Sequence, residues 1–411
     1  MSDKQYHELG RGGFGTVYWK KDEKGRKIAI KEMELTDEGI PSLMELSIMS
    51  TINHPFLNKA SKIVIEEKYV SIYQEIAIND LYHYTRKYKN KDKKFIGVRP
   101  SSYQLKLWTH QLAQVLNYLH QNDIVHGDVK ASNILLYDND TIKLTDFSIS
   151  QKTWNMPIKK SLCTSSHRPP EMWNLDEKWI DYEDAFKIDM WSLGCTLYEL
   201  LFGSCLFKIY YNEEDKSNTK YDTIKKRFHN LLIDWDIITN QGYYNDKEKY
   251  QCDYISLNLI NAFNHPSDED KPFVTLIKQL LMIDPKLRPS SLEICLDPLF
   301  QGFTMPIASI LTNSLPKIYT ENELLNKLSI EGSVKNLSLQ IYGRLEDTVL
   351  QKDPFSIHAC LWIANKLVYN GRIENKLKKE VNQKNADYRV VQLERKICEY
   401  LGFRLHNIYK K

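Results

Sequence analysis

Three glycines near the start of the chain constrain its fold more than any other feature of the sequence. Gly10, Gly12 and Gly15 form the pattern G-x-G-x-x-G, with Val17 after it. Dinucleotide-binding turns share this spacing, but there a helix follows the glycines. Here the residues on both sides have strand character, so a hairpin is expected. Such a hairpin can close its backbone amides over phosphate groups, because glycine lets the backbone approach a ligand closely.

A lysine and a glutamate fit the same interpretation. Lys31 ends the β-rich run I-A-I-K, and a lysine there can pair with the α- and β-phosphates of a nucleotide. Its orientation requires a carboxylate from a nearby helix. Residues 42–52 have helical spacing, and one face carries Leu43, Leu46, Met49 and, less regularly, Ile52. Glu45 lies in this helix, and we expect it to be the partner of Lys31.

The middle of the chain carries further motifs in a fixed order. They are H-G-D-V-K-A-S-N at 126–133, D-F-S at 146–148, P-P-E at 169–171, D-M-W-S-L-G at 189–194 and a late D-P-K-L-R-P that contains Arg288. A single aspartate such as Asp128 or Asp146 is most often a turn or cap residue. The order and spacing of all these motifs make the interpretation specific. Over residues 3–303 the chain resembles the protein kinase family.

This resemblance implies a two-lobed fold and transfer of a phosphoryl group from ATP with the help of Mg²⁺. Asp128 would orient the substrate hydroxyl and accept its proton, and Lys130 would neutralise the γ-phosphate. Asn133 and Asp146 would hold the magnesium ions. The catalytic set that the resemblance implies is completed by the pair already described, Lys31 and Glu45.

The ATP-binding positions of the family correspond here to a larger set of residues. They are Gly10, Arg11, Gly12, Gly13, Phe14, Gly15, Val17, Ala29, Lys31, Glu75 and Ala77. The hinge that contacts adenine would lie near the last two of these. Either Gln74 or Tyr73 would guard the pocket behind it.

Other matched residues are expected to be structural. Glu171 and Arg288 resemble the buried ion pair that anchors the end of the activation segment, and Asp189 resembles the residue that holds the backbone of the catalytic loop. His126 is expected to be a packed scaffold residue. Lys130 and Thr164, the latter in C-T-S-S-H-R-P-P-E, resemble the pattern of serine/threonine kinases rather than tyrosine kinases.

The activation segment departs from the family pattern. Gly127 stands where many kinases have an arginine that pairs with a phosphate on this segment. The usual phosphothreonine position falls near Lys159 and Lys160, which cannot be phosphorylated. The sequence therefore predicts a kinase that needs no activation-loop phosphorylation, and phosphorylation of Ser161 or Thr153 is the alternative.

The magnesium motif departs from the pattern as well. Ser148 replaces a glycine and restricts the backbone freedom that lets this segment flip. With Gly127, it supports an alternative from another class: a nucleotide-binding pseudokinase that acts as a scaffold or an allosteric partner. The intact residues Asp128, Asn133 and Asp146 favour the active enzyme.

One stretch resembles cyclin-dependent kinases in particular. E-G-I-P-S-L-M-E-L-S at 38–47, with N-H-P at 53–55, is similar to their E-G-x-P-S…E helix in a shortened form. In that family a cyclin pushes this helix into place and so brings the glutamate to the lysine. Such kinases often carry phosphorylatable residues in the glycine loop, where this chain has Gly13 and Phe14. Inhibition by phosphorylation of that loop is therefore not expected.

Residues 304–411 are predicted to form a small helical domain, with helices at 334–348, 354–368 and 388–401. The middle helix is apolar nearly all round, so we expect it to be buried. I-A-N-K-L and the later Q-L-E-R-K-I-C-E-Y-L-G-F-R-L resemble a single cyclin box. That resemblance implies that Lys366 and Glu394 contact the helix of Glu45. A generic helical bundle is the alternative, and an inhibitory tail competes with an activating domain.

Composition excludes several classes of protein. The net charge of +3 is too balanced to indicate a nucleic-acid or membrane partner. The longest apolar stretch is too short and too polar to span a bilayer, and no secretory signal is visible. The cysteines form neither C-x-x-C nor a zinc spacing, which favours reduced thiols in the cytoplasm, with the nucleus as an alternative. The abundance of Asn, Lys, Ile and Tyr favours an AT-rich genome, as in some protists and large DNA viruses.

The predicted fold class is α+β, a two-lobed protein kinase fold followed by a small all-α domain. The β-rich N-lobe is expected at 1–78, the helical C-lobe at 79–303 and the helical domain at 304–411. Residues 1–303 are net acidic and residues 304–411 net basic, which weakly favours their docking. The predicted function is that of a protein serine/threonine kinase that uses ATP and Mg²⁺, resembles cyclin-dependent kinases and is activated in cis by its C-terminal domain.

Overall fold

The fold is taken from a computed structural model of the chain. It describes residues 6–12, 15–36, 40, 42–86, 88–89, 95–96, 98–153, 158–159, 163–173, 179–180, 182–207, 220–241, 263, 265–303, 332–345, 350, 356–368, 387–401 and 403. The chain divides into two compact units. The first consists of Met1–Ile76, Thr145–Trp154 and Ile307–Lys411, and the second of Ala77–Leu144 and Asn155–Pro306.

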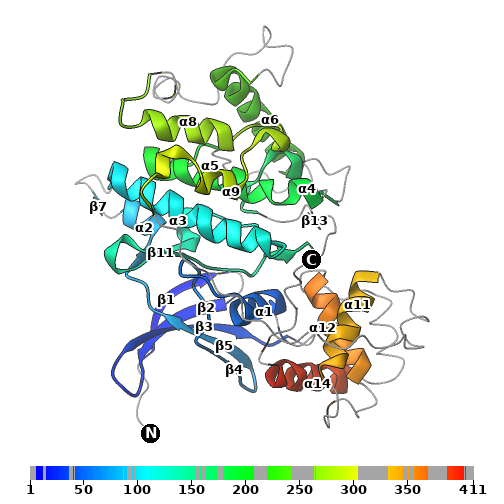
Figure 1. Cartoon of the computed structure of the whole chain (residues 1–411). Coiled ribbons are helices and arrows are strands. Elements are labelled where there is room, and N and C mark those ends of the chain that lie inside the picture. The colour runs from blue at the N-terminus through cyan, green and yellow to red at the C-terminus, as the bar shows by residue number, and fades with distance from the viewer. Residues whose placement is uncertain are drawn as a thin grey trace. The chain divides into compact units, whose positions relative to one another are not determined.

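A five-stranded antiparallel sheet forms the framework of the first unit, in the order β1-β2-β3-β5-β4 (Figure 1). Its strands are β1 (His7–Gly12), β2 (Gly15–Lys21), β3 (Lys27–Glu34), β4 (Lys62–Ile65) and β5 (Tyr69–Glu75). The glycine motif connects β1 and β2, which confirms the predicted hairpin. The chain reverses between β4 and β5, where Glu66 N–H donates to Tyr69 O.

Gly15 shows why this hairpin needs glycine. Its φ is +143°, and a Cβ atom at this position would lie only 2.2 Å from the carbonyl oxygen of Glu32 on β3. A side chain would therefore collide with backbone that is fixed in the sheet. Gly15 thus allows the close approach of β2 to β3, whereas a Cβ atom at Gly10 or Gly12 would meet nothing within 4 Å.

Helix α1 (Leu43–Thr51) is buried on all sides rather than on the one face that the sequence predicted. Met44, Ser47 and Ile48 are buried as fully as Leu43 and Leu46. The reason is a second covering layer, since α12 (Ser356–Val368) from the C-terminal region packs against α1. A pattern with apolar residues on one face underestimates the burial of a helix that has packing partners on both sides.

The C-terminal helices pack together in the first unit. They are α11 (Gly332–Gly343), α12 and α14 (Asp387–Tyr400), and α12 contacts both of the others (Figure 1). The apolar middle helix is buried as predicted, with Leu361, Ile363 and Ala364 fully covered. Helix α11 ends before the predicted residue 348, and residues 346–349 lie outside the described part. The short strand β12 (Gln151–Lys152) also contacts α12.

The second unit is mainly helical. Its helices are α2 (Leu81–Thr85), α3 (Ser102–Gln121), α4 (Tyr182–Ala185), α5 (Lys187–Phe202), α6 (Lys220–Thr239), α8 (Lys271–Leu280) and α9 (Ser291–Cys295). Helix α3 begins at a capping box in which Ser101 and Gln104 satisfy each other's backbone amides. No helix among the described residues is long and apolar enough to cross a membrane.

Short strands interrupt the region that the sequence predicted as mostly helical after α3. They are β9 (Ile124–Val125), β10 (Ile134–Leu136), β11 (Ile142–Leu144), β13 (Ile158–Lys159) and β14 (Trp179–Ile180). Strands β6 (Asn79–Asp80), β10 and β11 form one small sheet, and β7 (Tyr88–Lys89) pairs with β8 (Phe95–Ile96). Strands of two or three residues are too short to show an alternation of apolar and polar residues, so the sequence could not reveal them.

Candidate active site

Three residues that are distant in the sequence meet in the first unit. Lys31 Nζ on β3 donates to Glu45 Oε1 on α1 at 2.6 Å and to Asp146 Oδ1 at 3.2 Å. Lys31 and Glu45 are therefore partners, as the sequence predicted. The structure adds Asp146 as a second carboxylate on the same ammonium group.

Burial and charge act in opposite directions on this cluster. Burial by itself would lower the pKa of Lys31, but the carboxylates of Glu45 and Asp146 outweigh it and raise the pKa. Burial raises the pKa of Glu45, and the ammonium of Lys31 opposes this only in part. The second oxygen of Glu45, Oε2, accepts no hydrogen bond from the described residues. The Lys31 side chain is thus held charged and fixed in direction.

The sheet register identifies which residues share a face with Lys31. Val17 lies directly opposite Lys31 on β2, and Ala29 lies two residues earlier on β3. Because side chains alternate along a strand, all three project from the same face. Gln74 is opposite Ala29 and projects from this face too, whereas Tyr73 projects from the other. Of the two guard residues left open by the sequence, the register favours Gln74.

The rest of the predicted nucleotide set is only partly described. Gly10, Arg11 and Gly12 are exposed on β1, and Glu75 is exposed at the end of β5. Gly13 and Phe14 lie outside the described residues. Ala77 is half-buried in the second unit.

Asp128 is the centre of a hydrogen-bonded cluster in the second unit. Its Oδ1 accepts from the Thr164 hydroxyl at 2.7 Å, and its Oδ2 lies 2.7 Å from Lys130 Nζ. Lys130 Nζ also donates to the Thr164 hydroxyl at 2.9 Å. Sequence reasoning used Thr164 only to choose between classes of kinase, and the structure makes it a direct partner of the aspartate. The signal for that contact was the threonine in C-T-S-S-H-R-P-P-E.

These contacts keep Asp128 ionised. Burial by itself would raise the pKa of its carboxyl, but Lys130, the Thr164 hydroxyl and His126 outweigh burial and lower the pKa below its ordinary value. An ionised carboxylate can accept a hydrogen bond and then a proton from a substrate hydroxyl. The cluster therefore has the chemistry of a general base.

The backbone around Asp128 is fixed from α5. Asp189 is fully buried, and its two carboxylate oxygens accept the backbone amides of His126 and Gly127, both at 2.8 Å. Gly127 has a φ of +79°, a conformation that suits glycine and strains other residues. His126 itself is fully buried, as expected for a scaffold residue.

The predicted anchoring pair also forms within the second unit. Arg288 donates to both oxygens of Glu171, at 2.7 and 2.8 Å, and its side chain is fully buried. A bidentate contact of this kind fixes direction as well as distance. The sequence left Thr153 and Ser161 as alternative phosphorylation sites in the activation segment. The side chain of Thr153 is buried. Ser161 and the neighbouring Lys160 lie outside the described residues.

Each unit offers oxygen ligands that suit Mg²⁺. The Asn133 amide nitrogen donates to the backbone carbonyl and the carboxylate of Asp128, at 2.9 and 3.0 Å, which leaves the amide oxygen for a cation. Asp146 offers a carboxylate that is about one-third exposed. No cluster of three or more His, Cys, Asp or Glu residues suits a metal ion within the described part of the chain.

A buried ion pair from the C-terminal helices binds the backbone just before α1. Lys366 Nζ on α12 lies 2.7 Å from Glu394 Oε1 on α14 and donates to the Ile40 carbonyl at 3.0 Å. The Ile40 amide donates to Glu394 Oε2 at 3.4 Å. We call these contacts the Ile40 clamp. The sequence singled out Lys366 and Glu394, and the structure places their contact three residues ahead of the first residue of α1.

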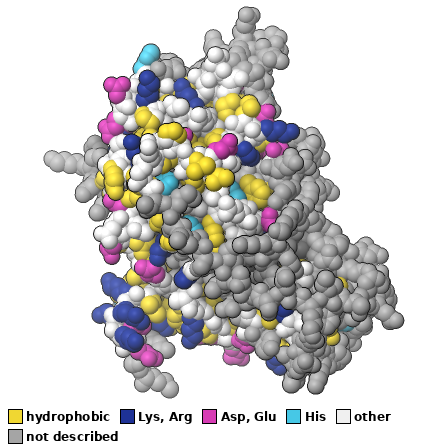
Figure 2. Space-filling view, in the orientation of Figure 1, with side chains coloured by type: hydrophobic (Ala, Val, Ile, Leu, Met, Phe, Trp, Pro, Cys, Tyr) yellow, Lys and Arg dark blue, Asp and Glu magenta, His cyan; other side chains and the backbone are white. Residues whose placement is uncertain are grey.

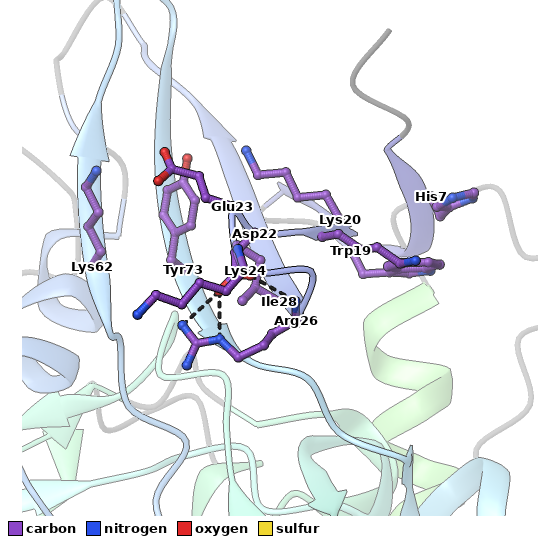
Figure 3. Close-up of a pocket in the computed structure, with 11 residues that line it drawn as sticks. His7, Trp19, Lys20, Asp22, Glu23, Lys24, Arg26, Ile28, Lys62 and Tyr73 are labelled. Carbon is purple, nitrogen blue, oxygen red and sulfur yellow. Dashed lines mark hydrogen bonds and ion pairs between the residues drawn. The ribbon is translucent and has the colours of Figure 1, made fainter. Parts of the chain in front are cut away.

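A hollow on the first unit has none of Lys31, Glu45 and Asp146 in its lining. It is lined by the ends of the strands, including Trp19, Lys20, Lys62 and Tyr73 (Figure 3). Lys and Arg side chains gather at the lower left in Figure 2, over this end of the sheet. The ammonium groups of Lys20 and Lys62 lie over the ring of Tyr73. Lysine side chains thus cover the ring of Tyr73 in this hollow.

Comparison with known proteins assigns the family. The protein kinase domain matches residues 4–300, so the chain belongs to the protein kinase family. The predicted fold class, a β-rich N-lobe and a helical C-lobe, is confirmed.

Similar proteins include an Aurora kinase of Eremothecium gossypii, 35% identical over 233 residues. Cell division control protein 2 homolog 3 of Trypanosoma brucei brucei is 32% identical over 208 residues, and cyclin-dependent kinase G1 of Arabidopsis thaliana is 31% identical over 217. The matches cover 55%, 49% and 50% of this chain, and 58%, 62% and 34% of those relatives. The chain thus spans less than two thirds of the length of each relative. The predicted resemblance to cyclin-dependent kinases is confirmed by the last two of these relatives.

Proposed function

We propose that the chain is a protein serine/threonine kinase that transfers the γ-phosphoryl group of ATP to protein hydroxyls. The observation that carries this proposal is the Asp128 cluster. Its carboxylate is kept ionised beside the ammonium of Lys130, and the Thr164 hydroxyl and the Asn133 amide fix its direction. A pseudokinase has no need to hold a general base in this state.

Each residue has a distinct part in the proposed reaction. Asp128 orients the substrate hydroxyl and takes its proton, and Lys130 stabilises the charge on the transferring phosphoryl group. Lys31 binds the α- and β-phosphates, held in direction by Glu45. Mg²⁺, when bound by Asn133 and Asp146, neutralises charge on the phosphates.

Phosphoryl transfer from labelled ATP to generic protein substrates tests the proposal. The full chain with Mg²⁺ is expected to label substrate, and the Asp146→Asn variant is expected to be inactive. ATP binding without transfer would instead favour the pseudokinase alternative. Intact mass and peptide mapping of the active enzyme test whether activation-loop phosphorylation is needed. Activity confined to a form phosphorylated between residues 153 and 161 would contradict the expectation that it is not.

The Thr164 hydroxyl provides a test by pH. Thr164→Val removes its bond to Asp128 and so raises the pKa of that carboxyl. Because Asp128 must be ionised to accept a proton, the acid limb of the kcat/KM profile should move to higher pH. Loss of a hydrogen bond to a charged group also predicts a fall in kcat of about 10- to 100-fold.

Thr164→Ser is the matched control, since it keeps the hydroxyl. Its acid limb should stay close to that of the natural chain. An acid limb that is the same in both variants would show that the contact with Asp128 has no part in setting its protonation.

We further propose that the C-terminal helices act as a cyclin-like activator in cis. The Ile40 clamp supports this, because it satisfies both the amide and the carbonyl of the residue that leads into α1. The side chains of Lys366 and Glu394 are almost completely buried. Burial raises the pKa of Glu394, while Lys366 and the Ile40 amide oppose this by stabilising the carboxylate. A buried ion pair persists only when such hydrogen bonds compensate for lost solvation.

The clamp acts on catalysis through the position of Glu45. Fixing Ile40 fixes the start of α1, and α12 covers the side of α1 that would otherwise face solvent. Glu45 is then held where Lys31 can bind it. Tethering gives the activator an effective concentration near ~1 mM, so no encounter between separate chains is required.

Lys366→Met tests activation without removing the domain. It should lower kcat/KM by about tenfold or more, because it removes the donor to the Ile40 carbonyl and leaves the buried Glu394 without its ion-pair partner. Lys396→Met, an exposed lysine on the same helix as Glu394, is the matched control and should leave activity unchanged. Higher activity in Lys366→Met would support an inhibitory tail instead. Deletion of 304–411 is a second variant, and undiminished turnover in a folded truncation would contradict activation.

A further inference from the structure

Ser148 is buried beside the magnesium ligand rather than pointing to solvent. It is 4% exposed, and its hydroxyl donates to Asp146 Oδ1 at 2.8 Å. That oxygen is the one that also accepts from Lys31 Nζ at 3.2 Å. The residue that seemed to weaken the motif therefore makes a direct contact with its carboxylate.

The two donors constrain how the carboxylate can turn. The terminal torsion of an aspartate is broad and nearly two-fold, so a carboxylate with one partner can rotate easily. Here the Ser148 hydroxyl and the Lys31 ammonium both donate to Oδ1. These two contacts fix the plane of the carboxylate and therefore the position of Oδ2. Asp146 also has a left-handed backbone, with a φ of +65°. Non-glycine residues hold that conformation only when neighbouring contacts support it.

We propose that Ser148 is a positioning residue for the metal-binding carboxylate of Asp146. Its hydroxyl holds Oδ1 and so fixes the orientation of the carboxylate before a divalent cation binds to Oδ2. Cation binding then does not have to immobilise the side chain. The inference rests on the proposed function only in taking Asp146 as a metal ligand. Ser148 touches neither substrate nor cation in this role and acts through Asp146.

An opposite effect is also chemically reasonable. Donation from a hydroxyl withdraws electron density from the carboxylate and weakens its bond to a cation. Partners of ligating carboxylates nevertheless favour binding in general, and their loss typically weakens metal affinity about 10- to 100-fold. The sign of the change in affinity therefore decides between the two effects.

The test measures Mn²⁺ binding to the full chain in the presence of a non-hydrolysable ATP analogue, by the loss of the free Mn²⁺ signal in electron paramagnetic resonance. Ser148→Ala removes the hydroxyl and keeps Cβ, and it should raise the Kd for Mn²⁺ about tenfold. Ser148→Gly restores the residue usual in kinases and should show a similar rise. Ser50→Ala is the control, because that hydroxyl bonds only the Leu46 carbonyl among the contacts described.

Two further measurements separate positioning from a merely structural role. The affinity for the analogue without metal should be unchanged in Ser148→Ala, and in an Asp146→Asn background the same change should have no further effect on Mn²⁺. An unchanged or lower Kd in Ser148→Ala would overturn the inference, as would an equal loss of metal-free nucleotide binding. Failure of the proposed function would look different, since substrate would stay unlabelled while Mn²⁺ binding still depended on Ser148.

Discussion

The ion pair between Lys31 and Glu45 is the contact on which the catalytic arrangement of the first unit depends. A lysine on a strand and a glutamate on a helix can meet at 2.6 Å only if α1 is held firmly against the sheet. The pair cannot supply that force alone, because burying both charges costs solvation that their attraction only partly returns. The position of α1 must therefore come from packing elsewhere.

The C-terminal helices supply that packing. Helix α12 covers the second side of α1, and the Ile40 clamp holds the backbone that leads into it. The same helix contacts β12, a few residues after Asp146. One helical domain thus borders both the helix that carries Glu45 and the segment that carries Asp146. In cyclin-dependent kinases this task falls to a separate chain, and here it is proposed to fall to the same one.

The sequence singled out residues that the structure brings into contact, but it predicted less of what surrounds them. Residues such as Asp128, Asn133 and Asp146 could be found because short motifs fix them relative to their own neighbours. The burial of both sides of α1 could not be predicted in this way, because the helix that covers its second side begins at Ser356, far away in the sequence. A choice between Gln74 and Tyr73 needed the pairing register of β3 and β5. Ser148 was correctly noted as unusual, but its contact with Asp146 depends on a side-chain direction that no motif specifies.

Amide hydrogen exchange at residues 40–51 tests the dependence of α1 on the C-terminal helices most directly. In the natural chain, the Ile40 amide and the helix amides should exchange slowly, because Ile40 donates to a buried carboxylate and α1 is covered on both sides. In Lys366→Met, exchange across this stretch should become faster while the β1–β3 strands stay protected. Equal protection of residues 40–51 in both proteins would contradict the account, because α1 would then hold its place without the clamp.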